Sequence, residues 1–132
     1  MNGRVDVLVV DDEPVVRDAV TRVLAAVGLM VETAPDAETA LVSPAAATCR
    51  MVLCDLMLPG ESGLYLLRQL RARRPELPIA MITGYATPAN AESVREAGAT
   101  AFLPKPFDED ELLTLVRHAL AQTDVAGEEP RP

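Results

Sequence analysis

The sequence is poor in the residues on which disulfide, zinc and membrane proteins depend. It has two cysteines and one histidine in 132 residues, and Cys49 and Cys54 lack the neighbouring histidines of a zinc site. No apolar run approaches the roughly 18 residues that suggest a membrane span, and no charged-then-apolar signal peptide opens the chain. We therefore expect a cytoplasmic protein with reduced thiols, in which Cys54 is a buried structural residue.

Positive charge is also scarce, and lysine is the scarcest. The formal net charge is −8, and only one of the twelve basic side chains is a lysine, Lys105. Nucleic-acid binders and anionic-membrane binders depend on clustered positive charge, so we expect no direct nucleic-acid binding and no membrane binding. Any chemistry that needs a compact ammonium group must use Lys105.

Apolar segments alternate with helical patterns along the chain. Nearly continuous apolar runs are typical of parallel strands covered on both faces, and strands are predicted at 5–10, 30–33, 51–54, 79–82 and 100–103. Helical periods are predicted at 14–27, 36–42, 62–73, 88–97 and 108–121. This order predicts an α/β fold, a doubly wound five-stranded parallel sheet with five helices.

Domain organisation is simple at this length. We expect one domain over residues 1–122, and a flexible tail or the start of a linker over 123–132, which lacks an apolar period. Asp108 and Glu111 have the spacing of a capping box at the start of the last helix. The basic cluster of the third helix is expected to be a solvated face; it comprises Arg68, Arg71, Arg73 and Arg74.

Chemically active residues follow four of the predicted strands. Asp11 and Asp12 (with Glu13) follow the first strand, Asp55 the third, Thr83 the fourth and Lys105 the fifth. Each alone has an ordinary explanation as a cap, a turn or a surface charge, but parallel strands bring them all to one edge of the sheet. Hard oxygen ligands without Cys or His favour Mg²⁺. Together with an ammonium and a hydroxyl they suit a phosphoryl group, with Asp55 as the nucleophile.

Four segments carry a family resemblance: VLVVDDEPVVR, LCDLMLPGESGL, MITGYA and GATAFLPKPF. Over residues 4–121 the chain resembles the receiver domain of bacterial response regulators. The resemblance implies a flavodoxin-like fold with strand order 2-1-3-4-5. It also implies a cytoplasmic phosphoprotein of two-component systems that carries an aspartyl phosphate in phosphorelay signal transduction.

The resemblance also implies residue roles. Asp55 would accept a phosphoryl group from a sensor histidine kinase or a histidine phosphotransfer protein. Mg²⁺ would be bound by Asp11, Asp12, Asp55 and the backbone carbonyl of Met57. The phosphoryl group would be bound by Thr83 and Lys105, the switch would consist of Thr83 and Phe102, and Pro106 would form the turn after the lysine, commonly a cis peptide in the family.

Signalling would follow from that switch. Phosphorylation would reshape the face formed by the fourth helix, the fifth strand and the fifth helix, which would control a downstream protein or output domain; a homodimer through this face is compatible with the resemblance. Such a domain is not an enzyme with a turned-over substrate, although it assists its own phosphorylation and dephosphorylation.

Three positions are looser matches to the family. Phe102 lacks the hydroxyl that many relatives carry, which leaves its rotation plausible but removes one hydrogen bond. Met57 and Tyr85 occupy variable positions, where their bulk would shield the acyl phosphate and give a slow-to-moderate loss of phosphate.

Val15 lies off the apolar stripe of the first helix and is expected to be exposed beside the site, where the phosphodonor docks.

Other classes fit the residues less well. A phosphatase of the haloacid-dehalogenase type needs its nucleophile and its acid two residues apart after the first strand, whereas the acceptor-like carboxylate here follows the third. A flavin carrier needs a first loop that welcomes phosphate, and Asp-Asp-Glu repels it. The alternative that stays open is a receiver-like protein-binding module that acts without phosphorylation.

Overall fold

A five-stranded parallel sheet forms the centre of the molecule. The computed structural model describes residues 4–128, and the side chains of residues 4–122. All four strand pairings are parallel, and the order is β2-β1-β3-β4-β5, as predicted. The strands are β1 (Val7–Val10), β2 (Val31–Ala34), β3 (Met51–Asp55), β4 (Ile79–Thr83) and β5 (Ala101–Pro104).

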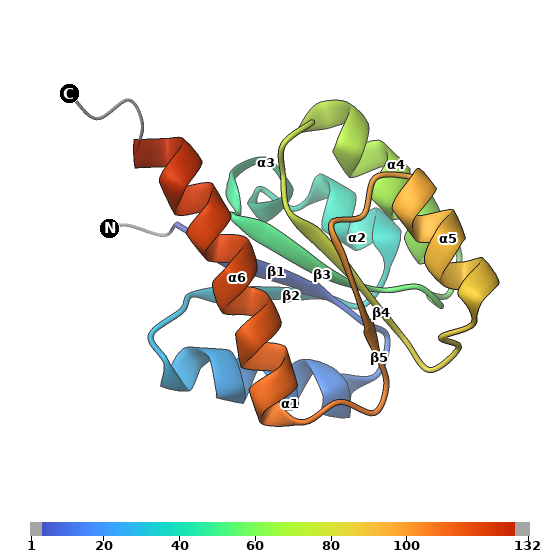
Figure 1. The fold of residues 1–132 in the computed structure, drawn as a ribbon, viewed down its shortest axis with the longest axis horizontal. Helices are drawn as coiled ribbons and strands as arrows, with labels where there is room; N and C mark the ends of the chain where they lie inside the picture. The colour runs from blue at the N-terminus through green and yellow to red at the C-terminus, as the bar shows by residue number, and fades with distance from the viewer. Residues whose placement is uncertain (1–3, 129–132) are drawn as a thin grey trace.

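Helices cover both faces of the sheet (Figure 1). They are α1 (Pro14–Ala26), α2 (Ala37–Val42), α3 (Ala45–Thr48), α4 (Gly63–Arg73), α5 (Pro88–Glu96) and α6 (Glu109–Glu128). Successive side chains of a strand point to opposite faces. In β1, Leu8 and Val10 therefore pack against the α2–α5 side, whereas Val7 and Val9 pack against α1 and α6. All four are fully buried, which stabilises each by about 1.5–3 kcal/mol relative to exposure.

The structure has one helix more than the sequence predicted. Pro44 ends α2, because the residue before a proline avoids the helical region. Pro44 itself has helical dihedral angles, however, and starts the single turn α3. Ala45 and Ala46 of that turn are buried against the core, so packing rather than periodicity produces α3, and a four-residue helix leaves little periodic signal.

Helix α6 is also longer than predicted. It continues to Glu128, past the expected end near residue 121, and no proline interrupts the sequence before Pro130. Part of the predicted tail is therefore helical, and its last residues, 129–132, lie outside the described residues. The capping box at the start of α6 is confirmed, because Asp108 and Glu111 each accept a hydrogen bond from the other's backbone N–H.

The arginines of α4 are not uniformly solvated, which corrects the sequence prediction. Arg68 and Arg73 are exposed, but Arg71 and Arg74 are half-buried. The guanidinium of Arg71 donates to the carbonyl oxygens of Gly98, Arg74 and Pro75. A guanidinium has five N–H donors and can therefore satisfy several terminal carbonyls at once, a use that the sequence pattern does not reveal.

Two further expectations concern the Cys54 thiol and membrane-spanning segments. The Cys54 thiol is fully buried, as predicted, and burial raises its pKa. Within residues 4–128, no helix has the length and apolar character needed to cross a membrane.

Candidate functional site

The carboxyl ends of four strands bring the predicted residues to one edge of the sheet. Asp11 follows β1, Asp55 ends β3, Thr83 ends β4 and Lys105 follows β5. The register pairs Val10 with Cys54, Asp55 with Ile82, and Thr83 with Pro104. These four strands therefore end nearly level with one another, and their last side chains share one rim.

Lys105 is the centre of this rim. Its ammonium nitrogen lies 2.9 Å from Asp55 Oδ2, 3.0 Å from Asp11 Oδ2 and 3.4 Å from Glu13 Oε1. An ammonium has three N–H donors, so the carboxylates of three residues occupy its full hydrogen-bonding capacity. The structure thus joins Asp11, Asp55 and Lys105 directly, and adds Glu13, for which the sequence predicted no role of its own.

Burial and charge act against each other within this cluster. Asp11 is fully buried and Asp55 is 5% exposed. Burial raises the pKa of Asp11 above its ordinary value and the like charge of Asp55 adds to this, although the Glu13 N–H and Lys105 oppose it. Partial burial works to lower the pKa of Lys105, but hydrogen bonds to Asp55 and Asp11 outweigh it and raise that pKa. Lys105 is therefore held as a cation.

The carboxylates are also close enough to bind one cation. Asp11, Asp12 and Asp55 each offer an oxygen atom, and these atoms all lie within 4.8 Å of one another. Asp12 is exposed whereas the other two are buried, so one side of the cluster is open to water. Oxygen ligands with room for water suit Mg²⁺, which keeps several of its waters. The donor set fits the ion that the sequence predicted.

Backbone N–H groups orient the two buried carboxylates. Glu13 N donates to Asp11 Oδ1 at 2.9 Å, and Met57 N donates to Asp55 Oδ1 at 3.0 Å. Arg17, which the sequence analysis did not single out, donates to the backbone oxygen of Asp11 at 2.7 Å. Its only signal in the sequence is its place in the first turns of α1, which many non-functional arginines share.

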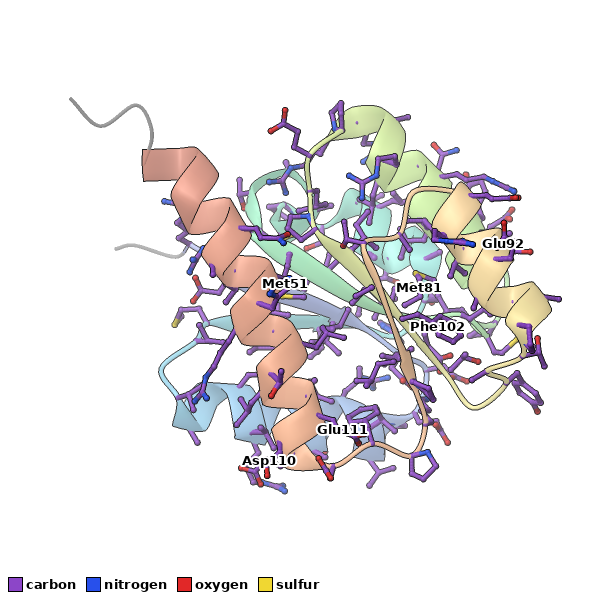
Figure 2. The ribbon with its side chains drawn as sticks, viewed as in Figure 1. Met51, Met81, Glu92, Phe102, Asp110 and Glu111 are labelled. Carbon is purple, nitrogen blue, oxygen red and sulfur yellow. The ribbon has the colours of Figure 1, made fainter. Side chains whose placement is uncertain are left out.

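Among the described residues, neither of the predicted switch residues forms a hydrogen bond with these carboxylates. Thr83 is fully buried, and its hydroxyl accepts a hydrogen bond from Tyr85 N at 3.0 Å. Phe102 pairs with Met81 across β4 and β5 and packs half-buried against the α2–α5 side of the core (Figure 2). The Lys105–Pro106 peptide bond is cis.

A hollow of about 320 Å³ opens over the acceptor-like carboxylate. It is lined by Asp12, Glu13, Asp55, Met57, Gly84, Tyr85 and Lys105. Met57 and Tyr85, which line the hollow, are 55% and 63% exposed. A small anion can therefore approach Asp55 and Lys105 from solvent.

Gly63 allows α4 to begin directly against the end of β3. A Cβ atom at this position would lie 2.1 Å from the backbone oxygen of Asp55 and 2.8 Å from Leu56 Cα. Both contacts are with backbone, which cannot give way as a flexible side chain can. Gly63 N also donates to the carbonyl of Leu56 at 3.0 Å. A side chain here would displace the end of β3.

The fold and the residues at this rim place the chain in the class of small doubly wound α/β domains that have an acidic site at the carboxyl end of the sheet. A model of the response regulator receiver domain family matches residues 7–117. The chain belongs to this family.

Individual relatives agree with this assignment. The chain is 38% identical over 115 residues to the DNA-binding transcriptional regulator NtrC of Salmonella typhimurium, with 87% of this chain and 24% of NtrC covered. It is 39% identical over 127 residues to the response regulator MprA of Mycolicibacterium vanbaalenii, with 94% and 55% covered. The crystal structure of a CheY-like receiver domain protein from Methanospirillum hungatei superposes with a TM-score of 0.85 at 29% identity, covering 94% of this chain and 99% of that one. The chain thus spans about a quarter of the length of NtrC and about half of MprA.

Proposed function

We propose that this chain is the phosphoacceptor of a two-component system, with Asp55 as the residue that is phosphorylated. The observation that carries the proposal is the position of Lys105 Nζ, 2.9 Å from Asp55 Oδ2 and 3.0 Å from Asp11 Oδ2. An ammonium placed beside an attacking carboxylate is suited to bind the oxygens of an incoming phosphoryl group. Catalysis of such a transfer consists largely of positioning and charge neutralisation.

The transfer itself exchanges one bond for another. An Asp55 carboxylate oxygen attacks phosphorus, the bond from phosphorus to the donor histidine nitrogen breaks, and the electron pair remains on the imidazole. Asp11, Asp12, Asp55 and the backbone carbonyl of Met57 would hold Mg²⁺, which when bound offsets the negative charge of the carboxylates and the phosphoryl oxygens. To bind a phosphoryl oxygen, the Lys105 ammonium would exchange one of its three carboxylate contacts, of which the one to exposed Glu13, at 3.4 Å, is the longest.

Phosphorylation then acts as a switch. The Thr83 hydroxyl, which accepts from Tyr85 N, would turn away from it to donate its O–H to a phosphoryl oxygen. Phe102 would move with it, so that the face of α5, β5 and α6 changes shape. A downstream protein or an output domain reads this face, which is also available for a homodimer. The chain assists its own phosphorylation and dephosphorylation without turning over a separate substrate, and we place this function in the cytoplasm. Met57 and Tyr85 at the border of the hollow would slow the access of water to the acyl phosphate.

The phosphodonor, a sensor histidine kinase or a histidine phosphotransfer protein, would dock on the α1–α6 groove. This groove of about 550 Å³ is lined by α1, the 105–109 loop and Leu112 of α6. At its end lies Val15, a 72% exposed apolar side chain beside the site. We expect Val15→Glu to slow transfer from the cognate kinase but not phosphorylation by acetyl phosphate. Equal losses with both donors would contradict docking at Val15.

The decisive test of the acceptor is intact mass after incubation with acetyl phosphate and Mg²⁺. Wild type should gain the mass of one phosphoryl group, only when Mg²⁺ is present. Asp55→Asn should gain nothing, and Asp6→Asn, the same substitution at the opposite end of the sheet, should behave as wild type. If wild type takes no phosphate from acetyl phosphate or from a phosphohistidine donor, the chain instead works as a phosphorylation-independent binding module.

A further inference from the structure

The loop between β4 and α5 contains two hydrogen bonds that link Thr83 to Asn90 through the backbone of Tyr85. Tyr85 N donates to the Thr83 hydroxyl at 3.0 Å. The Tyr85 carbonyl in turn accepts from Asn90 Nδ2 at 2.7 Å and from Thr87 N at 3.0 Å. Asn90 N donates to the Thr87 hydroxyl, which caps the helix. A side-chain amide in the first turns of α5 is thus two hydrogen bonds away from the buried hydroxyl.

Few other interactions fix the beginning of α5. Val94 is the only buried residue of this helix, which lies wholly within the described part of the chain. The neighbouring α4 buries Gly63, Leu66, Leu67 and Leu70. Most of the stability of a helix in a protein comes from packing of its apolar face, so α5 depends on polar contacts at its ends to a degree that α4 does not. Its outer face, which includes Glu92, points away from the sheet (Figure 2).

The far end of α5 is held by a different residue. Arg71 of α4 donates from Nη2 and Nε to the Gly98 carbonyl, at 2.7 and 3.2 Å. Gly98 has φ +111, and a Cβ there would lie 2.9 Å from Arg71 Nε. The two ends of α5 are therefore tied to different parts of the molecule, the end to α4 and the beginning to the Thr83 loop.

We propose that Asn90 is a positioning residue that couples the Thr83 hydroxyl to the first turns of α5. When the hydroxyl leaves Tyr85 N, that N–H loses its acceptor and the backbone of Tyr85 shifts. Asn90 transmits the shift to the helix, because its side-chain amide donates to the carbonyl of the same residue. Arg71 holds the Gly98 end, so the response is concentrated at the beginning of α5. The coupling itself is a property of the unphosphorylated chain; its use as a signal rests on the proposed function.

The first experiment needs no phosphorylation. The sequence has only two asparagines and two glutamines, so the side-chain amide signals of Asn90 are readily assigned in a ¹⁵N NMR spectrum with Asn90→Ala. Thr83→Val, or Thr83→Ala if the valine variant does not fold, should shift these signals, whereas Ser93→Ala, an exposed position on the same helix, should not. If the chemical shifts of the Asn90 side-chain amide stay unchanged when the Thr83 hydroxyl is removed, the proposal is overturned.

Amide hydrogen exchange tests the same coupling quantitatively. Ala91 N donates to the Thr87 carbonyl in the first turn of α5. Loss of one hydrogen bond at Asn90 or Thr83 should accelerate exchange of this amide by roughly 3- to 10-fold. In the double variant the effects should not multiply, because each single variant already breaks the same series of bonds. Multiplicative effects would refute the coupling.

The signalling use of Asn90 is measured afterwards with acetyl phosphate and Mg²⁺. Asn90→Ala should gain the same mass at the same rate as wild type and Ser93→Ala, yet its α5 backbone signals should change less on phosphorylation. An α5 response equal to that of wild type would overturn the signalling use. If wild type gains no mass, the proposed function fails, and the measurements on unphosphorylated protein still decide the coupling.

Discussion

At the amino end of the sheet, the carboxylate of Asp6 accepts hydrogen bonds from Arg50 Nη1 at 3.0 Å and from Met30 N at 2.8 Å. At the carboxyl end, by contrast, three carboxylates contact the single ammonium of Lys105, and Asp12 adds a fourth nearby. The two ends belong to the same strands, since Asp6 precedes β1 and Asp11 follows it. At the amino end, the Asp6 carboxylate is paired with one guanidinium, whereas at the carboxyl end the carboxylates outnumber the ammonium that they contact.

Like charges in one cluster repel, and burial strengthens the repulsion. The carboxyl end therefore lowers the stability of the metal-free fold, whereas the amino end adds to it. An excess of negative charge is what the proposed Mg²⁺ site requires, because the bound cation would offset it. The contrast can be tested with substitutions of the same type at each end.

Removal of the ammonium that contacts the carboxylates at the carboxyl end should have the largest effect. Lys105→Met leaves buried Asp11 and Asp55 without their ammonium, and we expect a loss of about 2–3 kcal/mol in the free energy of unfolding at neutral pH. Urea denaturation without Mg²⁺ measures this loss. Added Mg²⁺ should restore part of it by binding the native state. Unchanged stability would mean that Lys105 does not offset the carboxylates.

Matched Asp→Asn substitutions should have opposite signs at the two ends. Without Mg²⁺, Asp55→Asn relieves repulsion with Asp11 and should raise the free energy of unfolding by about 1 kcal/mol. Asp6→Asn weakens the hydrogen-bonded ion pair with Arg50 and should lower it by about 1 kcal/mol. Both are read from urea denaturation curves. If both destabilise, negative charge at the carboxyl end is not in excess.

The smallest effect concerns Asp36, a carboxylate that follows β2 at the same end but serves as a helix cap. It accepts from Thr39 N at 2.7 Å, and this hydrogen bond lowers its pKa below the ordinary 3.8. Its contribution to stability is therefore complete above 3.8 and lost as the pH falls through the lowered pKa. Asparagine caps almost as well without titrating. The free energy of unfolding of Asp36→Asn, measured by urea denaturation, should equal that of wild type at neutral pH and exceed it in acid. If the two free energies agree at every pH, the charge of Asp36 does not contribute to the cap.

The sequence predicted most of the fold because long apolar runs and helical periods leave strong signals. The parallel sheet and the principal helices follow from such segments, whereas the strand order came from the family resemblance. Helix α3 depends on the burial of Ala45 and Ala46, and a single helical turn is too short to give a periodic signal. Most of the site was equally accessible, since Asp11, Asp55 and Lys105 follow strands whose ends share an edge. The sequence did not predict the contacts of Glu13, Arg17 and Arg71, because these depend on which ammonium or carbonyl groups their long, flexible side chains reach.

Lys105 has a further consequence as the only lysine of the sequence. A reagent that acylates ε-amino groups has one target side chain here, and it reacts only with the uncharged amine. Hydrogen bonds to Asp11 and Asp55 keep that nitrogen protonated, so the intact site protects its lysine. The rate at which the Lys105 nitrogen is labelled therefore reports whether the carboxylates still hold it, and no other side chain contributes an ε-amino signal.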